Sequence, residues 1–159
     1  MKNLSILLSI LFAFLATPTF AQYVRADVDR GQSKCYQIGD VMLIGGELGV
    51  VFVVTPDGQH GKVVSTSQTQ ATWSDAKAWC SSLGQGWRLP SRDELNAIFN
   101  KRSELNTHLK ANGFTGLGGG YWSSEASGSS DAWYIVMTPR ITYSYDKNIN
   151  GYVRAVSAF

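Results

Sequence analysis

The sequence predicts a single α+β domain, in which two main helices pack on a small, mostly antiparallel sheet. Its 159 residues suffice for one domain and are too few for two ordinary ones. Strand-like runs come first, helical segments follow, and strand-like runs return in the C-terminal third. This grouped order is typical of α+β folds, whereas a parallel α/β sheet would alternate strands with helices.

The N-terminal residues have the pattern of a secretory signal peptide. Lys2 supplies a positive charge, Leu4 to Leu15 is an almost continuous apolar run, and Thr19-Phe20-Ala21 is a typical cleavage sequence. The run is too short to span a bilayer of roughly 30 Å, and no second hydrophobic span follows. We therefore expect a signal peptide over 1–21 rather than an uncleaved anchor, an N-terminal segment over 22–37 and a domain over 38–159. The mature protein is expected in the periplasm, at the cell surface or outside the cell, without membrane insertion.

Strand patterns dominate residues 41–65. Two β-rich runs over 41–44 and 50–54 flank a loop with three glycines over 45–49. A Pro-Asp-Gly turn at 56–58 precedes a further run over 62–65, so this part is predicted to be an antiparallel meander.

Two helices are expected next. The first begins near Thr72 or Ser74, either of which is a suitable cap, and ends before Gly84. The second begins at a capping box formed by Ser91 and Glu94. Its buried stripe is Leu95, Ile98 and Phe99, and a shorter helical turn follows over 105–109. Four short strands are then predicted, over 121–124, 133–138, 141–145 and 152–156.

Two cysteines allow only one intramolecular pairing, between Cys35 and Cys80. Export would place them where a disulfide persists, and closing this loop would stabilise the fold by roughly 4 kcal/mol. The alternative is a buried free thiol at Cys80, which shares a helical face with Trp73 and Ala76. Both alternatives remain open at the level of sequence.

A net charge of +2 provides no long-range field to attract nucleic acid, so no nucleic-acid partner is expected. Cofactor and metal sites are not expected either. Asp146 to Gly151 resembles the start of a calcium loop, but its twelfth position is Ser157 rather than a bidentate glutamate, which favours an Asn-Gly hairpin turn. Glu125 and Asp131 flank a Gly-Ser loop and are the carboxylate pair available to a glycan-acting hydrolase.

Five ordered motifs resemble a known family: Trp73 to Cys80, Gly86 to Leu95, Tyr121 to Glu125, Ala132-Trp133 and Tyr152 to Val156. They are similar to the DUF1566 domains of secreted bacterial proteins, which include the C-terminal domain of the Legionella collagen-like adhesin, and to the Fibrobacter major paralogous domain. The resemblance covers roughly 38–159. It implies a C-type-lectin-like fold of the kind shared with formylglycine-generating enzymes, and a binding module rather than an enzyme.

The motif residues are explained mainly by folding. Large apolar rings on short strands normally pack into a core, Pro90 prevents an early helix start, and Arg154 is expected to pair with a carboxylate if it is buried. The residues assigned this structural role are Trp73, Trp87, Arg88, Leu89, Pro90, Glu94, Trp122, Trp133 and Arg154.

The ligand site is predicted in the C-terminal hairpin region over 141–152. Tyrosines with small polar residues are typical of adaptable recognition surfaces, and aromatic faces suit stacking on sugars. The candidate binding residues are Tyr143, Tyr145, Asp146, Asn148, Asn150 and Tyr152. The expected function is noncatalytic recognition of a glycan or a surface protein. A structural or assembly subunit of a surface structure, such as an adhesin or fimbria, and a glycan-acting hydrolase are the alternatives.

Overall fold

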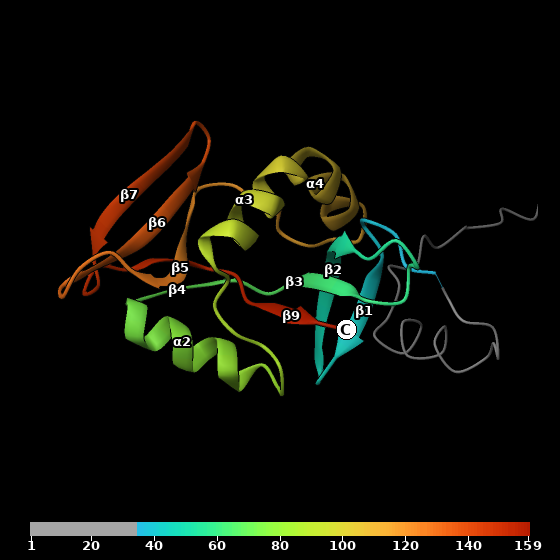
Figure 1. Ribbon diagram of the computed structural model, residues 1–159, viewed down its shortest axis with the longest axis horizontal. Coiled ribbons are helices and arrows are strands. Elements are labelled where there is room, and N and C mark those ends of the chain that lie inside the picture. The colour runs from blue at the N-terminus through green and yellow to red at the C-terminus, as the bar shows by residue number, and fades with distance from the viewer. Residues whose placement is uncertain (1–34) are drawn as a thin grey trace, which may run out of the picture.

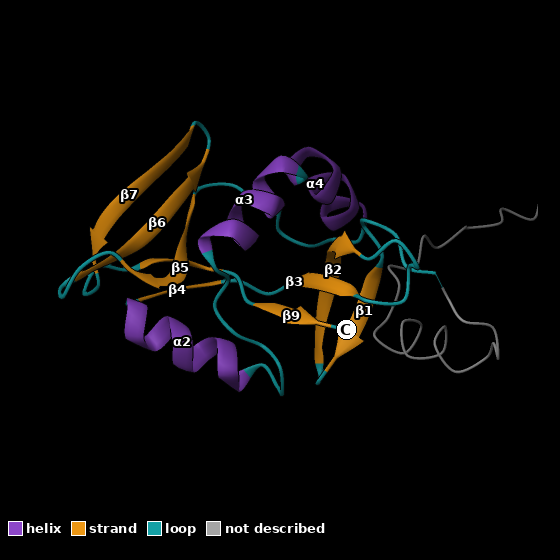
Figure 2. Cartoon of the chain, in the orientation of Figure 1, coloured by secondary structure: helices purple, strands orange, loops and turns teal. Residues whose placement is uncertain are grey.

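A computed structural model describes residues 35–159 of the protein. The predicted signal peptide over 1–21 and most of the segment over 22–37 lie outside the described residues. The described part forms an α+β domain with three helices and two sheets, as Figure 2 shows in purple and orange. None of its helices is long and apolar enough to cross a membrane.

The first sheet has four antiparallel strands in the order β1-β2-β3-β9. Their bounds are β1 Val41–Ile44, β2 Glu47–Val54, β3 Gly61–Ser65 and β9 Val156–Ala158. The loop expected over 45–49 is shorter than predicted. Gly45 and Gly46 both have positive φ, so a two-residue turn connects β1 to β2 and the strand resumes at Glu47.

The second sheet has five strands in the order β4-β8-β5-β6-β7. Their bounds are β4 Thr69–Ala71, β8 Gly151–Val153, β5 Gly120–Ala126, β6 Asp131–Met137 and β7 Arg140–Asp146. Neighbours are antiparallel except β5 and β8. The single strand predicted over 152–156 is two strands, because the chain leaves this sheet at Arg154 and Ala155 and enters the first sheet as β9.

The predicted hairpin over 141–152 is wrong. Strand β7 pairs with β6 along its whole length, and β8 lies between β4 and β5 instead of beside β7. The turn that follows Asp146 therefore connects two strands that are not neighbours. Its Asn-Gly sequence indicated a tight turn, but a turn sequence does not determine which strands pair.

The predicted helix starts are confirmed. Helix α2 (Trp73–Ser82) is capped by Thr72, and α3 (Arg92–Asn100) begins with the Ser91–Glu94 capping box. The short turn expected over 105–109 is a full helix, α4 (Arg102–Ala111), in which Leu105 and Leu109 are buried. Helices α2 and α3 lie on opposite sides of the second sheet (Figure 1).

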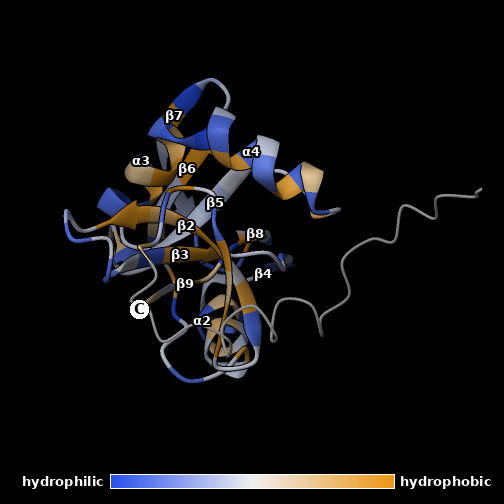
Figure 3. Ribbon diagram, turned by 90° about the vertical axis from the view of Figure 1, so that its right-hand side faces the viewer, coloured by the Kyte–Doolittle hydropathy of each residue, from blue (hydrophilic) through white to orange (hydrophobic). Residues whose placement is uncertain are grey.

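Two hydrophobic clusters form the core. One contains Tyr121, Ile135 and residues of α3 and α4, and the other contains Trp122, Ala132 and residues of α2. These are the two faces of the five-stranded sheet, since successive strand residues alternate between faces. Figure 3 colours β2 and β6 largely as hydrophobic segments. The prediction that Trp87 and Trp122 are buried is confirmed, with 3% and 0% exposure.

Trp133 does not lie in the core as expected. It is half-buried, and the guanidinium of Arg92 lies 4.6 Å from the centre of its ring. Its position on β6 places it on the α3 side of the sheet, where the first turn of α3 covers it only in part. A cation over an indole face keeps this ring partly exposed to solvent.

Arg154 is buried as expected, with 1% exposure, but the prediction of a carboxylate partner is wrong. Its guanidinium donates hydrogen bonds to the backbone carbonyls of Ser65, Thr66 and Thr115 and to the side chain of Gln68. The chain turns from one sheet to the other at this point, and the carbonyls at this crossover have no strand partner. Arg154 satisfies them, and burial lowers its pKa.

Candidate functional site

Strand β7 carries the most exposed apolar surface of the described chain. All seven of its residues are exposed. The exposed large hydrophobic residues of the described chain are Ile141 at 38%, Tyr143 at 45%, Tyr145 at 37% and Ile149 at 43%. Three of these lie on one face of β7, because residues two apart on a strand share a face. We call Ile141, Tyr143, Tyr145 and the neighbouring Tyr134 of β6 the aromatic face.

The aromatic face is held in place by stacking. Tyr134 and Tyr145 are stacked, with ring centres 5.3 Å apart and an interplanar angle of 21°. The buried Trp122 contacts Tyr134 edge-on at 5.1 Å and Tyr145 at 5.9 Å. Tyr134 lies over Gly120 and Gly151, whose missing Cβ atoms leave space for its ring. Stacking on Tyr134 and contact with the buried Trp122 therefore position the exposed ring of Tyr145.

The structure brings together some of the predicted ligand residues and separates others. Tyr143 and Tyr145 share the aromatic face, while Asp146, Asn148 and Asn150 are exposed at the end of β7 and in the turn after it. Tyr152 lies on the opposite face, because it pairs with Tyr121 and contacts that ring at 6.1 Å in the α3 side of the core. Tyr152 is half-buried and lies on the other side of the sheet from Tyr143 and Tyr145.

Tyr134, Ile141 and Ile149 were missed by sequence reasoning. Tyr134 is directly opposite Tyr143 in the β6–β7 register, so correct pairing of these strands would have identified it. The assumed hairpin between 141–145 and 152–156 directed attention to Tyr152 instead.

The turn after β7 is well fixed. The Asp146 carboxylate accepts a hydrogen bond from the Asn148 backbone amide at 2.8 Å. Lys147 donates to the carbonyls of Gly128 and Ser129, and its ammonium lies 4.9 Å from the centre of the Trp73 ring. Asn148 and Asn150 are exposed in this turn. Within residues 35–159, no group of three His, Cys, Asp or Glu side chains is placed to hold a metal ion.

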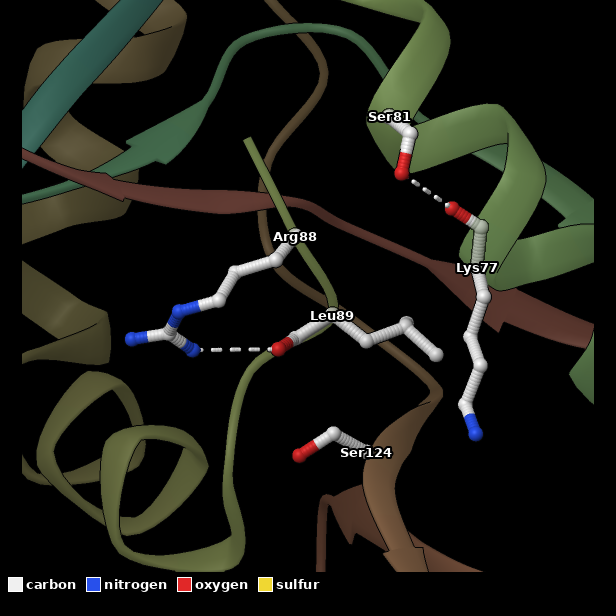
Figure 4. A pocket seen from close by; sticks show the side chains of 5 residues that line it. All are labelled: Lys77, Ser81, Arg88, Leu89 and Ser124. Atoms are coloured by element: carbon white, nitrogen blue, oxygen red, sulfur yellow. Dashed lines mark hydrogen bonds between the residues drawn. The ribbon is translucent and has the colours of Figure 1, made fainter. Parts of the chain in front are cut away.

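A separate pocket of about 300 Å³ lies between α2 and the segment before α3 (Figure 4). It is lined by Lys77, Ser81, Arg88, Leu89 and Ser124. The ammonium of Lys77 lies 3.2 Å from the centre of the Trp73 ring, and burial lowers its pKa, as does the nearby Lys147. None of the predicted ligand residues lines this pocket.

Arg88 lines the pocket, but its guanidinium is hydrogen-bonded to the Glu94 carboxylate. Its guanidinium forms two hydrogen bonds with the Glu94 carboxylate, at 2.7 and 2.8 Å, and Lys62 forms a third at 2.8 Å. Burial raises the pKa of Glu94, but these bonds and one from the Ser91 amide outweigh it and lower the pKa to about 2. The capping box and the motif arginine are thus one structural unit.

Of the two carboxylates considered for a hydrolase, Asp131 begins β6 opposite Asp146 of β7, and Glu125 is hydrogen-bonded at the start of α3. The Glu125 carboxylate accepts a hydrogen bond from the Arg92 amide at the start of α3. Burial raises the pKa of Cys80 to about 12, so its thiol stays protonated at neutral pH. Cys35 is exposed and Cys80 is buried. Both are free thiols, so the structure contains the buried thiol at Cys80 and not the Cys35–Cys80 disulfide.

The fold and this surface define a class of protein: an α+β domain whose exposed aromatic residues are concentrated on one strand. The family model of the Lcl C-terminal domain, named after the Legionella collagen-like protein, matches residues 54–157. The chain therefore belongs to the Lcl C-terminal domain family, which comprises adhesin-type domains of surface or secreted proteins. No curated protein matches the chain.

Proposed function

We propose that this protein is an exported, noncatalytic recognition module that binds a glycan or a surface protein through its aromatic face. The observation that carries the proposal is the concentration of exposed large hydrophobic residues on β7 and the turn after it. Exposing large apolar side chains to water is unfavourable in free energy, and a group of them on one surface is typical of an interaction site. Membership in an adhesin-type family supports the same conclusion. The predicted signal peptide, with cleavage after Ala21, would export the protein.

The chemistry of the aromatic face suits a sugar ring. Tyr143 and Tyr145 are exposed aromatic residues, a side-chain type suited to packing against the apolar face of a pyranose, and each ring loses little entropy on binding. The amides of Asn148 and Asn150 are close enough in sequence to reach the hydroxyl groups of such a ligand. Tyr152, on the opposite face, is left out of the proposed site. We further propose a C-type-lectin-like arrangement for the domain, in line with its two sheets and flanking helices.

Catalysis has less support than recognition. The Glu125 carboxylate of the hydrolase hypothesis already accepts a hydrogen bond from the Arg92 amide at the start of α3. The aromatic face contains no nucleophile with an adjacent base. These features favour binding over catalysis for this surface.

A glycan array tests the proposed function directly. The purified protein should bind a defined subset of glycans, or a defined surface protein in a parallel binding screen of envelope and matrix proteins. Binding should persist in EDTA, since no carboxylate cluster in the described part of the chain is placed to hold calcium. A structural subunit of a surface assembly would bind no array ligand at any useful affinity, and that result would contradict the proposal.

A further inference from the structure

Strand β7 is an open edge as well as an exposed face. Within the described chain it is hydrogen-bonded to β6 alone and ends the five-stranded sheet. The other three edge strands are short, with four residues in β1 and three each in β4 and β9, whereas β7 has seven. Proteins usually protect a long edge with proline, lysine or a bulge. β7 contains no proline or lysine, and its register with β6 has no shift.

The sequence of β7 is complementary to itself when read in opposite directions. An antiparallel pair centred on Tyr143 would place Arg140 of one copy opposite Asp146 of the other at both ends. Ile141 would then face Tyr145, and Thr142 would face Ser144. We propose that two copies of this chain pair antiparallel through β7, about a two-fold axis at Tyr143, to form one continuous ten-stranded sheet. This pairing is isologous and closed, so it stops at the dimer.

The charges of Arg140 and Asp146 favour the antiparallel pair over a parallel one. A parallel, in-register pair would oppose Arg140 with Arg140 and Asp146 with Asp146, and like charges directly opposite are destabilising. Asp146 already lies opposite Asp131 of β6, and the ion pairs within the described chain include neither carboxylate. The Arg140 guanidinium donates a hydrogen bond to Asn96 Oδ1 at 2.7 Å and lies 5.4 Å from the centre of the Phe99 ring, without a carboxylate partner among the described residues. In the dimer it would exchange the neutral Asn96 contact for the Asp146 carboxylate of the second copy. A second copy is thus the partner that this edge fits best.

The proposed dimer would join the two aromatic faces. Opposite residues of an antiparallel pair share a face, so Ile141, Tyr143 and Tyr145 of both copies would lie on one side of the sheet. A single pair of seven-residue strands buries less than a standard interface, so we expect a dissociation constant of roughly 10–100 μM. The inference concerns the edge of β7 and does not depend on the identity of the ligand.

Charge reversal tests the pairing. The variants Arg140→Asp and Asp146→Arg each place like charges opposite one another at both ends of a homodimer. Sedimentation equilibrium, at protein concentrations up to about 500 μM, should show a dimer for the unmodified protein and a dissociation constant about tenfold or more higher for each variant. An equimolar mixture should restore the dimer, because every pair in the heterodimer is then Asp with Arg.

The matched control is Lys110→Asp, which makes the same charge change as Arg140→Asp on the exposed surface of α4. It should dimerise like the unmodified protein. A monomer at every concentration, dimerisation unaffected by the single variants, or a mixture no stronger than its components would each overturn the proposal. Far-UV circular dichroism of each variant confirms that the fold is retained. Glycan binding below the dissociation constant tests the proposed function separately.

Discussion

At the scale of residues, the two buried charged side chains Glu94 and Arg154 are stabilised by different kinds of partner. Glu94 is 7% exposed at its side chain and is neutralised by Arg88 and Lys62. Arg154 has no ionic partner among the described residues and instead satisfies carbonyl groups at the crossover between sheets. Capping-box spacing predicted the contact between Ser91 and Glu94 but not the ion pairs of Glu94 with Arg88 and Lys62. The partners of Arg154 were not predicted either, because they are mainly backbone groups of segments far apart in the sequence.

Glu94→Gln should make the free energy of unfolding less dependent on pH in the acidic range. The pKa of this carboxyl is about 2 in the folded protein against 4.5 for an unperturbed group, so its contribution is complete above pH 4.5 and is lost as pH falls from 4.5 towards 2. After allowance for its half-exposed partners, we expect a loss of about 2 kcal/mol at pH 7. Urea unfolding at several pH values measures it. Asp93→Asn, in the same helical turn but exposed, is the control, and an equal effect there would contradict the account.

Arg154→Lys should be strongly destabilising although it keeps the charge. A lysine ammonium cannot reach three carbonyl groups with the planar geometry of a guanidinium, and each buried acceptor left unpaired costs about 1–3 kcal/mol. We expect a loss of about 3–5 kcal/mol in the free energy of unfolding, measured by urea titration. A loss below 1 kcal/mol would show that water or another side chain replaces these bonds.

At the scale of elements, the order of strands and helices followed from sequence, but the pairing of strands did not. Alternation and glycine turns located β2, β3 and β6, and capping residues located α2 and α3. The partner of β7 was predicted wrongly, because Asn-Gly after β7 favoured a hairpin with the next strand. In the structure, the Tyr134 ring of β6 packs over Gly120 of β5 and Gly151 of β8, an arrangement in which β8 lies beside β5.

Gly120→Ala should disturb the aromatic face without opening the rest of the core. An added Cβ would collide with the ring of Tyr134, which supports Tyr145 by stacking. We expect a change in near-UV circular dichroism and a loss of about 1–3 kcal/mol in stability from overpacking. Gly118→Ala is the matched control, because its Cβ meets no atom within 4 Å. Identical spectra for the two variants would show that Tyr134 is not held in this way.

At the scale of the whole molecule, two short crossovers connect the sheets, one from β3 to β4 and one from β8 to β9. The chain passes from β8 to β9 through Arg154 and Ala155, so the C-terminal residues complete both sheets. Family membership and the general fold class were accessible from the motifs. The motifs did not indicate which part of the second sheet stays uncovered, because that depends on how far α2 and α3 extend across it. The two clusters place α2 and α3 against the two faces of β5 and part of β6, whereas every residue of β7 is exposed.

The most direct test of the central claim compares two alanine variants of adjacent residues on β7. Tyr143→Ala removes a ring from the aromatic face, whereas Thr142→Ala changes the opposite face of the same strand. Both are exposed, so each should alter stability by no more than about 0.5 kcal/mol. Affinity for the ligand identified on the array, measured by titration calorimetry below about 10 μM protein to keep the chain monomeric, should fall at least about tenfold for Tyr143→Ala and remain unchanged for Thr142→Ala. Equal affinities for both variants and the unmodified protein would place the binding site elsewhere and contradict the account.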